Sequence, residues 1–168
     1  MGSKDHSFDI ISEVNFMELD NAVVQVKKEL LQRFDFKGSM ASVDLDQKEK
    51  KITLKAENDY KLKALTDMLQ LKCSKRGVSL KALEFGKVET GHVGGSVQQI
   101  VNVQSGIPSD KAKEIVRAIK DAKIKGVQPS IQSDQVRVQS TKIDDLQGAI
   151  SFVKSQDFGL DLQFVNYR

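Results

Sequence analysis

Four stretches of the chain place apolar residues three or four positions apart, the spacing that puts them on one face of a helix. In the first stretch, Leu19, Ala22, Val23, Val26 and Leu30 form a single apolar stripe. This pattern predicts an amphipathic helix whose stripe packs against a core. The other three stripes fall within residues 62–73, 112–119 and 146–153.

Between these helices, short segments alternate apolar with polar residues, which is the period of a strand with one covered face. Residues 41–45 and 52–56 show the alternation most clearly, with a polar turn between them. Helices and strands therefore follow one another in the order βαββαβ, twice. The predicted strands are residues 8–14, 41–45, 52–56, 80–88, 96–104, 127–132, 135–139 and 160–165.

Polar residues stand where these helices are expected to begin and so predict their caps. The first and last helices carry capping boxes, in which an acidic residue follows the cap by three positions. Gly77, after three cations, is expected to end the second helix. The predicted caps are Asn15 with Glu18, Asn58 or Asp59, Ser109, and Thr141 with Asp144.

The two βαββαβ halves also resemble each other in sequence. A shift of 84 positions places residues 52–54 on residues 136–138, and Leu62, Leu65 and Leu69 on Leu146, Ala149 and Val153. A duplicated unit is therefore expected. Such a unit folds as a ferredoxin-like plait of class α+β, with an antiparallel sheet and two helices on one face. The Gly-rich residues 89–95 form the connector between the copies.

The uncovered sheet faces are expected to carry no aromatic residues, so base stacking on either sheet is not predicted. The first sheet presents Lys51, Thr53 and Lys55. The second presents mostly glutamine, suited either to hydrogen bonding or to packing against the other half. Its outward residues are Gln128, Ser130, Gln132, Gln135, Arg137, Gln139 and Gln163.

Composition and charge describe an ordinary globular protein. Of its 168 residues, 39% are apolar and 29% charged, and the net charge of +3 is too small for a dedicated duplex-DNA binder. We expect no membrane span and no signal peptide, and residues 1–6 are set aside. A single cysteine, Cys73, fits a reducing compartment, so we expect a cytoplasmic protein.

Residues 33–39, with the sequence RFDFKGS, are the segment least typical of a scaffold. Phe34 is in phase with the preceding helix and is expected to pack inward, which leaves Phe36 available to a ligand. Lys37, Gly38 and Ser39 offer a charge, an approachable backbone and a hydroxyl to a phosphate or a base edge. Alternatively, both rings belong to the core and the cations are simply solvated.

A second basic feature lies on the third helix. Lys113, Arg117 and Lys120 share one face, and Lys123 and Lys125 follow it. The stripe either binds phosphates or is a solvated helix face.

Signatures of catalysis and metal binding are missing from the sequence. It has no phosphate-binding loop of the Walker type, no dinucleotide fingerprint and no metal-ligand spacing. Cys73 lies on a buried stripe, and His6 and His92 have no partner set. Gly91, Gly94 and Gly95 precede a strand, so no helix dipole aids phosphate binding there. We expect a non-enzyme without cofactor or metal.

Several short motifs together resemble the YajQ family of bacterial proteins, over nearly the whole chain. The resemblance implies two ferredoxin-like domains with their N-terminal strands exchanged. It places residues 16–90 plus 95–106 in the first domain and residues 1–15 plus 107–168 in the second. The motifs lie at residues 7–10, 33–38, 75–77, 104–107, 118–121, 135–138, 144–147 and 163–168.

The same resemblance implies that the ligand is a nucleotide, RNA or cyclic di-GMP. It also implies that the protein contacts a transcription regulator. We expect a monomer. Two positions depart from the family pattern: Val165 stands where family members often have Lys, and Tyr167 where they usually have Phe. The loss of that lysine weakens the expectation that the last strand binds a phosphate. The rival hypothesis is a regulatory protein–protein interaction module that acts through its open sheet faces. The residues predicted to bind nucleotide are Arg33, Phe34, Asp35, Phe36, Lys37, Gly38, Asn166, Tyr167 and Arg168.

Overall fold

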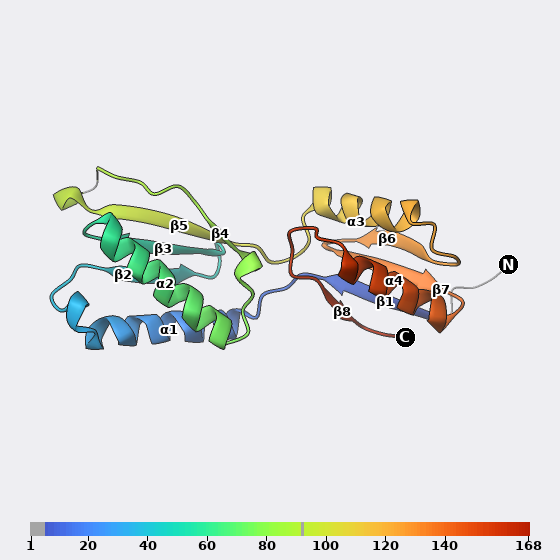
Figure 1. Ribbon diagram of the computed structural model, residues 1–168, viewed down its shortest axis with the longest axis horizontal. Helices are drawn as coiled ribbons and strands as arrows, with labels where there is room; N and C mark the ends of the chain where they lie inside the picture. The colour runs from blue at the N-terminus through green and yellow to red at the C-terminus, as the bar shows by residue number, and fades with distance from the viewer. Residues whose placement is uncertain (1–5, 92) are drawn as a thin grey trace. The chain divides into compact units, whose positions relative to one another are not determined.

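The computed structural model of the protein describes residues 6–91 and 93–168. The chain divides into two compact units, and each is described here by itself (Figure 1). One unit is Val14–Gln104, and the other combines the residues up to Glu13 with Ser105–Arg168. Among the described residues, no helix is both long and apolar enough to cross a membrane.

The unit Val14–Gln104 contains one four-stranded antiparallel sheet with the strand order β2-β3-β5-β4. Its helices are α1 (Phe16–Gln32) and α2 (Asp59–Lys75), with short 3₁₀ turns η1 (Phe34–Phe36), η2 (Leu80–Ala82) and η3 (Val93–Gly95). Its strands are β2 (Ser42–Asp46), β3 (Lys51–Ala56), β4 (Leu83–Phe85) and β5 (Val97–Val103).

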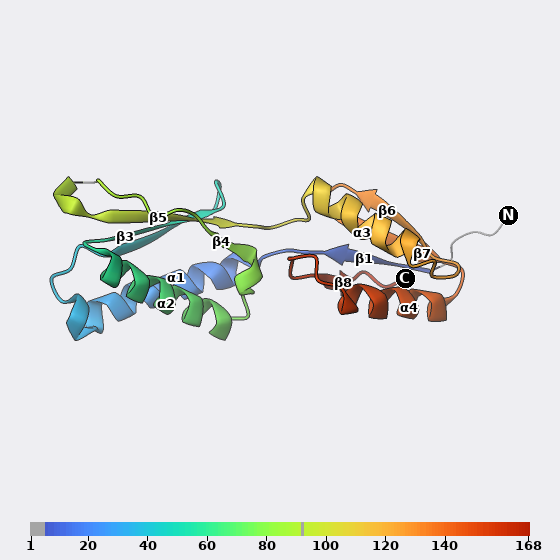
Figure 2. The same ribbon diagram turned by 45° about the horizontal axis from the view of Figure 1, so that its top comes forward.

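Both helices of this unit cover the same face of the sheet, as Figure 2 shows. Leu19 and Val23 of α1, and Leu65 of α2, belong to the same buried cluster as Ile52 of β3. All four are at most 1% exposed. Burial of such side chains is worth about 1.5–3 kcal/mol each, so the predicted stripes supply the main stabilising contacts of the unit.

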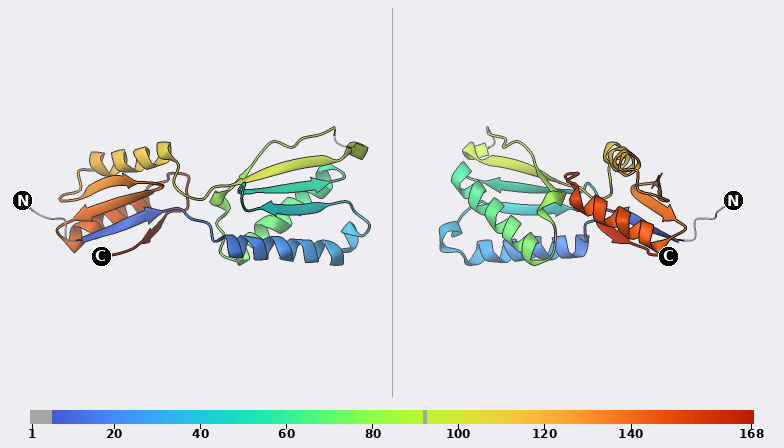
Figure 3. Two further views of the ribbon diagram at one scale, coloured as in Figure 1. Left: turned by 180° about the vertical axis from the view of Figure 1, so that it is seen from behind. Right: turned by 45° about the vertical axis from the view of Figure 1, so that its right-hand side comes forward.

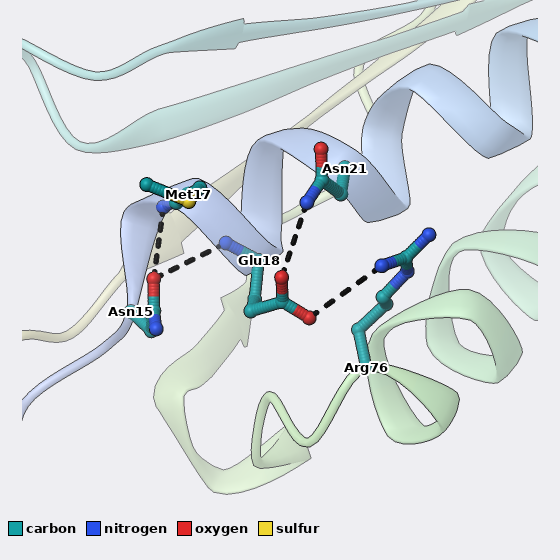
Figure 4. Close-up of polar contacts among 5 residues, drawn as sticks. All are labelled: Asn15, Met17, Glu18, Asn21 and Arg76. Atoms are coloured by element: carbon teal, nitrogen blue, oxygen red, sulfur yellow. Dashed lines mark hydrogen bonds and ion pairs between the residues drawn. The ribbon is translucent and has the colours of Figure 1, made fainter.

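The first turn of α1 is fixed by polar contacts at both of its sides (Figure 4). Asn15 caps the helix, because its side-chain oxygen accepts hydrogen bonds from the backbone N–H groups of Met17 (3.1 Å) and Glu18 (3.2 Å). The Glu18 carboxylate does not close the predicted capping box. It accepts a hydrogen bond from Asn21 (3.1 Å) and pairs with Arg76 (3.7 Å), which links the start of α1 to the end of α2.

The second unit has the corresponding sheet order, β6-β7-β1-β8, and is also antiparallel throughout. Figure 3 shows the N-terminal strand β1 lying between β7 and β8. Its helices, α3 (Ser109–Asp121) and α4 (Ile143–Ser155), share one core with the inward residues of β1 and β7. Its strands are β1 (His6–Ile11), β6 (Gln128–Gln132), β7 (Gln135–Ser140) and β8 (Gln163–Val165).

The predicted α+β class is confirmed, with four helices and two four-stranded antiparallel sheets that fit two ferredoxin-like domains. Strand β1 pairs with strands from the second half of the sequence, and β5 pairs with strands from the first half. That an exchange between two duplicated repeats produced this pairing stays a prediction, as do the domain limits.

Several predicted element ends were wrong. Residues 80–88 form η2 and only a short β4, because the Ser79 hydroxyl accepts a hydrogen bond from Lys81 N–H and favours a turn. Of the predicted strand 160–165, only Gln163–Val165 (β8) is a strand. The predicted start of α2 is confirmed: of Asn58 and Asp59, Asn58 is the cap, and its side-chain oxygen accepts a 2.8 Å hydrogen bond from Lys61 N–H.

The predicted caps of α3 and α4 were also wrong. Pro108 precedes α3, and Ser109 is already its first helical residue. Lys142 precedes α4, and neither Thr141 nor Asp144 supplies a side-chain cap. Ser140 accounts for the difference at α4, since its hydroxyl accepts a hydrogen bond from Lys142 N–H (3.1 Å).

Asp9 of β1 anchors the end of the chain to the sheet. Its side chain lies on the sheet face opposite Phe8 and is only 3% exposed. It accepts hydrogen bonds from Arg137 Nε (3.0 Å) and Asn166 Nδ2 (2.9 Å). Burial opposes ionisation of the carboxyl, but the hydrogen bonds from Arg137 and Asn166 and the charges of Arg137 and Arg168 lower its pKa below the ordinary 3.8.

Replacement of Asp9 by Asn is expected to lower the free energy of unfolding by about 2 kcal/mol at pH 7, because a buried charged acceptor is lost. Because the pKa of Asp9 is lower in the folded than in the unfolded protein, its ionised carboxylate stabilises the fold at any pH above the unfolded-state pKa. This stabilisation is lost as the pH falls through the folded-state pKa. The wild-type advantage should therefore shrink below pH 3.8. Urea unfolding at pH 7 and pH 3 measures it, and an advantage that grows in acid would contradict the assignment.

Candidate functional site

Residues 33–39 form a tight turn at the end of α1. The helix stops at Gln32, where the N–H of Arg33 donates the last hydrogen bond, to the Glu29 carbonyl (2.8 Å). The turn η1 follows, and Gly38 then adopts a φ of 73°. No atom lies within 4 Å of where a Cβ of Gly38 would be, so the backbone angle rather than crowding calls for glycine.

The two phenylalanines of this turn are placed opposite to the prediction. Phe34 is 89% exposed, and Phe36 is buried at 3% exposure. The prediction that Phe34 packs inward and Phe36 is available was therefore wrong. Its error was to extend the helical phase beyond Gln32, whereas the 3₁₀ turn rotates Phe34 outward and Phe36 toward the core.

Two cations flank the buried Phe36 ring. The guanidinium carbon of Arg33 lies 5.4 Å from the ring centroid, and the ammonium of Lys61 lies 4.8 Å from it. Both distances are within the range of cation–π attraction. Sequence reasoning missed Lys61, which is far from the turn in sequence, and only its place just after the Asn58 cap could have suggested an ordered position.

Arg33 is already paired with Asp35. Its Nε and an Nη donate hydrogen bonds of 3.0 and 2.7 Å to the two oxygens of that carboxylate. The hydrogen bonds lower the pKa of Asp35 and raise that of Arg33. A phosphate would have to compete with this two-pronged contact, so Arg33 is less available than predicted.

The Ser39 hydroxyl is also engaged. It donates to Glu57 Oε1 (2.6 Å) and accepts from the N–H of Ala41 (3.0 Å). Burial opposes ionisation of Glu57, but the hydrogen bond from Ser39 helps to lower its pKa. Within the described residues, the exposed ammonium of Lys37 and the N–H of Gly38 have no hydrogen-bond or ion-pair partner. These two groups can receive an anion.

A hollow of about 200 Å³ adjoins the turn. This volume is below the roughly 300 Å³ of a typical small-molecule pocket, so it can hold one part of a larger ligand. Leu31, which is out of phase with the apolar stripe of α1, is 89% exposed at its edge. The exposed off-phase leucine was a sequence signal for this surface. The lining residues are Leu30, Leu31, Phe36, Lys37, Gly38, Ser39 and Ala41.

The other predicted nucleotide-binding residues belong to the second unit. Asn166 Nδ2 is engaged by Asp9 (2.9 Å), and Tyr167 is 64% exposed with its ring centroid 6.1 Å from that of Phe8. The Arg168 main chain pairs with Ser7 through hydrogen bonds of 3.0 and 3.3 Å. The C-terminal residues are therefore held by contacts within their own unit.

The predicted basic patch on α3 is exposed. Lys113, Arg117, Lys120 and Lys123 all face solvent, and none of them forms an ion pair among the described residues. The Lys111–Glu114 pair (3.4 Å) lies on the same helix. The geometry is equally compatible with a solvated face, so phosphate binding there stays a prediction.

The other chemically distinctive residues show no assembled site. Burial raises the pKa of the Cys73 thiol to about 11, which keeps it protonated and unreactive. Gly91, Gly94 and Gly95 lie between β4 and β5. His92 lies outside the described residues. Within residues 6–91 and 93–168, no three His, Cys, Asp or Glu side chains gather as a metal site would require.

Comparison with known proteins agrees with the resemblance in the motifs. The chain matches the family described as "Nucleotide-binding protein YajQ-like" over residues 6–168. It is 51% identical over 166 residues to a "Nucleotide-binding protein" of Carboxydothermus hydrogenoformans, covering 99% of each chain. A protein of the same name from Desulfitobacterium hafniense is 52% identical over 166 residues, again covering 99% of each chain.

A third relative, a "Nucleotide-binding protein" of Endomicrobium trichonymphae, is 52% identical over 162 residues, which cover 96% of this chain and 97% of the relative. The likeness thus extends through both units and includes the turn at residues 33–39. This chain belongs to the YajQ-like family of nucleotide-binding proteins.

Proposed function

We propose that the protein binds its nucleotide at the turn of residues 33–39, without catalysis, in the bacterial cytoplasm. The observation that supports this most is that one turn carries the exposed Phe34 ring together with Lys37 and Gly38, which line a hollow and whose ammonium and N–H have no partner in the described part of the chain. A stacking ring and two anion-binding groups are the elements that bind a base and its phosphate. The ligand classes proposed are a mononucleotide, RNA, or a cyclic dinucleotide such as cyclic di-GMP.

In this proposal, Phe34 takes the stacking role first assigned to Phe36. The buried Phe36 holds the turn in place, together with the cations on its ring. Lys37 and Gly38 bind phosphate. Arg33 and Asp35 bind each other and fix the shape of the turn. They therefore affect the ligand through the geometry of the turn and are not its main charge partners.

Ser39 has a positioning role, because its hydroxyl ties the turn to Glu57. The bond connects the residues after η1 to Glu57, the residue that follows β3. Since Gly38 lies next to Ser39, this contact restricts where the Gly38 N–H can point. A preorganised donor binds a phosphate with a smaller entropic cost than a mobile one.

A regulatory interaction module, contacting a partner such as a transcription regulator, is the second candidate. The exposed Gln128 and Gln132 on the open sheet face of the second unit favour it, since amide side chains suit a polar protein contact. On the same face, Arg137 donates a hydrogen bond to Asp9, so its guanidinium is less free to contact a protein partner.

Replacement of Phe34 by Ala is expected to weaken nucleotide binding about 5- to 150-fold, because one base–aromatic stack is worth about 1–3 kcal/mol. Fluorescence anisotropy with labelled GMP, cyclic di-GMP and a short single-stranded RNA measures the change and ranks the ligands. Met17→Ala is the matched control, since Met17 is an exposed apolar residue (73%) at the other end of α1.

Phe36→Ala separates stacking from folding. This variant should lose about 3–5 kcal/mol of unfolding free energy, since a buried ring is removed, whereas Phe34→Ala should unfold like the wild type. Unchanged affinity in a folded Phe34→Ala protein would contradict the proposed site.

Replacement of Lys37 by Gln should make RNA binding less salt-dependent. Each phosphate contact adds about 0.7 to the slope of log affinity against log salt for a single strand, so the slope should fall by about that amount. Anisotropy titrations between low and high salt give the slope. A double variant of Lys113 and Arg117 tests the α3 patch in the same way, and an unchanged slope there would remove the patch from the ligand site.

The two candidate functions predict different material after gentle purification. Nucleotide binding predicts that nucleotide or RNA copurifies with the wild-type protein and is reduced in Phe34→Ala, as detected by mass spectrometry. The interaction module instead predicts a protein complex that survives nuclease treatment and is lost in a Gln128→Glu and Gln132→Glu double variant. Recovery of that complex without any nucleotide would favour the second candidate.

A further inference from the structure

Helix α1 carries a second apolar stripe, on the side away from the core. Its members, Met17, Val24 and Leu31, are 73%, 38% and 89% exposed, and none of them belongs to the buried cluster of their unit. They are spaced by seven residues, which is close to two full turns of a helix, so they lie nearly in line. Because all three are exposed, their own unit leaves this outer stripe uncovered.

Charged residues are divided unevenly along the same side of α1. Asp20 lies in its first half, and Lys27 and Lys28 lie in its second half, all three exposed. At about 100° of rotation per residue, Asp20 and Lys27 fall on one side of the outer stripe, and Lys28 falls on the other beside Asn21. The Asp20 carboxylate has no partner in the described part of the chain, and Lys27 pairs with Asp44 (3.6 Å) only at the exposed surface.

This arrangement is self-complementary when two copies of α1 pack antiparallel. A two-fold axis at the level of Val24 places Val24 opposite itself and Met17 opposite Leu31 of the second copy. The same axis places Asp20 opposite Lys27 of the second copy, and symmetry repeats this contact. A parallel pairing would instead bring the lysines of both copies together, which is repulsive. Charge complementarity therefore selects a second copy in the antiparallel orientation.

We propose that the outer stripe of α1 is a self-association surface, through which two copies of this chain pack antiparallel as a dimer. A contact limited to one helix from each copy is smaller than the roughly 1,200–2,000 Å² of a stable interface, so the dimer is weak and reversible. The monomer expected from the sequence is then the form at low concentration. The proposal does not rest on nucleotide binding.

Sedimentation of the full chain between roughly 10 μM and 1 mM should show a dimer that grows with concentration, because this range spans the dissociation constants of weak interfaces. Leu31→Glu places a carboxylate opposite Met17 of the second copy and should weaken the dimer at least about 10-fold. Leu71→Glu is the matched control, since it makes the same exchange at an exposed leucine of α2 (52%), and it should leave the dimer unchanged.

Exchange of charges tests the orientation of the two helices. Asp20→Lys places two lysines opposite each other at both symmetric contacts and should weaken the dimer at least about 5-fold. The double variant Asp20→Lys with Lys27→Asp restores opposite charges and should return the Kd to within about twofold of the wild type. Because Lys27→Asp also removes the pair with Asp44, Asp44→Asn controls for that loss.

A cysteine at the two-fold axis tests the geometry directly. Val24→Cys should form a disulfide-linked dimer on mild oxidation, because the two Cβ atoms face each other across the axis. Leu71→Cys is the control and should cross-link more slowly. The native Cys73 is buried and does not take part.

Four results would overturn the proposal. They are a monomer throughout the concentration range, a dimer that Leu31→Glu leaves intact, a double charge variant that dimerises no better than Asp20→Lys, and equal cross-linking of Val24→Cys and Leu71→Cys. Thermal unfolding of each variant distinguishes a lost dimer from a lost fold. Met17→Ala should also weaken the dimer, so its use as a control for nucleotide binding requires concentrations at which the wild type is monomeric.

Discussion

In each sheet, one of the two central strands is the element that holds an edge strand to the rest of the sheet. Strand β5 joins β3 to β4, and β1 joins β7 to β8. The Asp9–Arg137 contact on β1 connects residues 128 positions apart. Because each sheet is incomplete without that strand, the helix-facing cores depend on its pairings, and in the second unit the pairing of β1 with β7 closes a very long loop.

The sequence pattern predicted the helices and the core well, because period and burial are linked directly. Leu19, Val23 and Val26 are buried on α1 as their spacing indicates, and Leu62, Leu65 and Leu69 do the same on α2. Strand ends were harder to predict, since a single local hydrogen bond, such as that of Ser79, decides between a strand and a turn. The predicted cap of α4 failed where the neighbouring Ser140 bound the Lys142 N–H just before the helix.

The site at residues 33–39 was located by composition, but its two rings could not be assigned from the sequence. The assignment depends on where α1 stops, and the periodic pattern alone does not fix that residue. Once Phe36 is buried, cations from Arg33 and Lys61 approach its ring, and Asp35 then binds the guanidinium of Arg33. The chemistry left at the surface is therefore what these internal contacts do not use, namely Phe34, Lys37 and the Gly38 N–H.

The same principle applies to the C-terminal residues, which the motifs had grouped with this turn. At the C-terminal end of the described chain, Asp9 binds Arg137 and Asn166, and Phe8 contacts Tyr167, so these contacts order the residues after β8. What stays exposed there is the Tyr167 ring. At the turn after α1, the Lys37 ammonium and the Gly38 N–H have no partner in the described part of the chain, and the Phe34 ring of the same turn is exposed. A phosphate with a stackable base can therefore use groups of this turn that the internal contacts leave free.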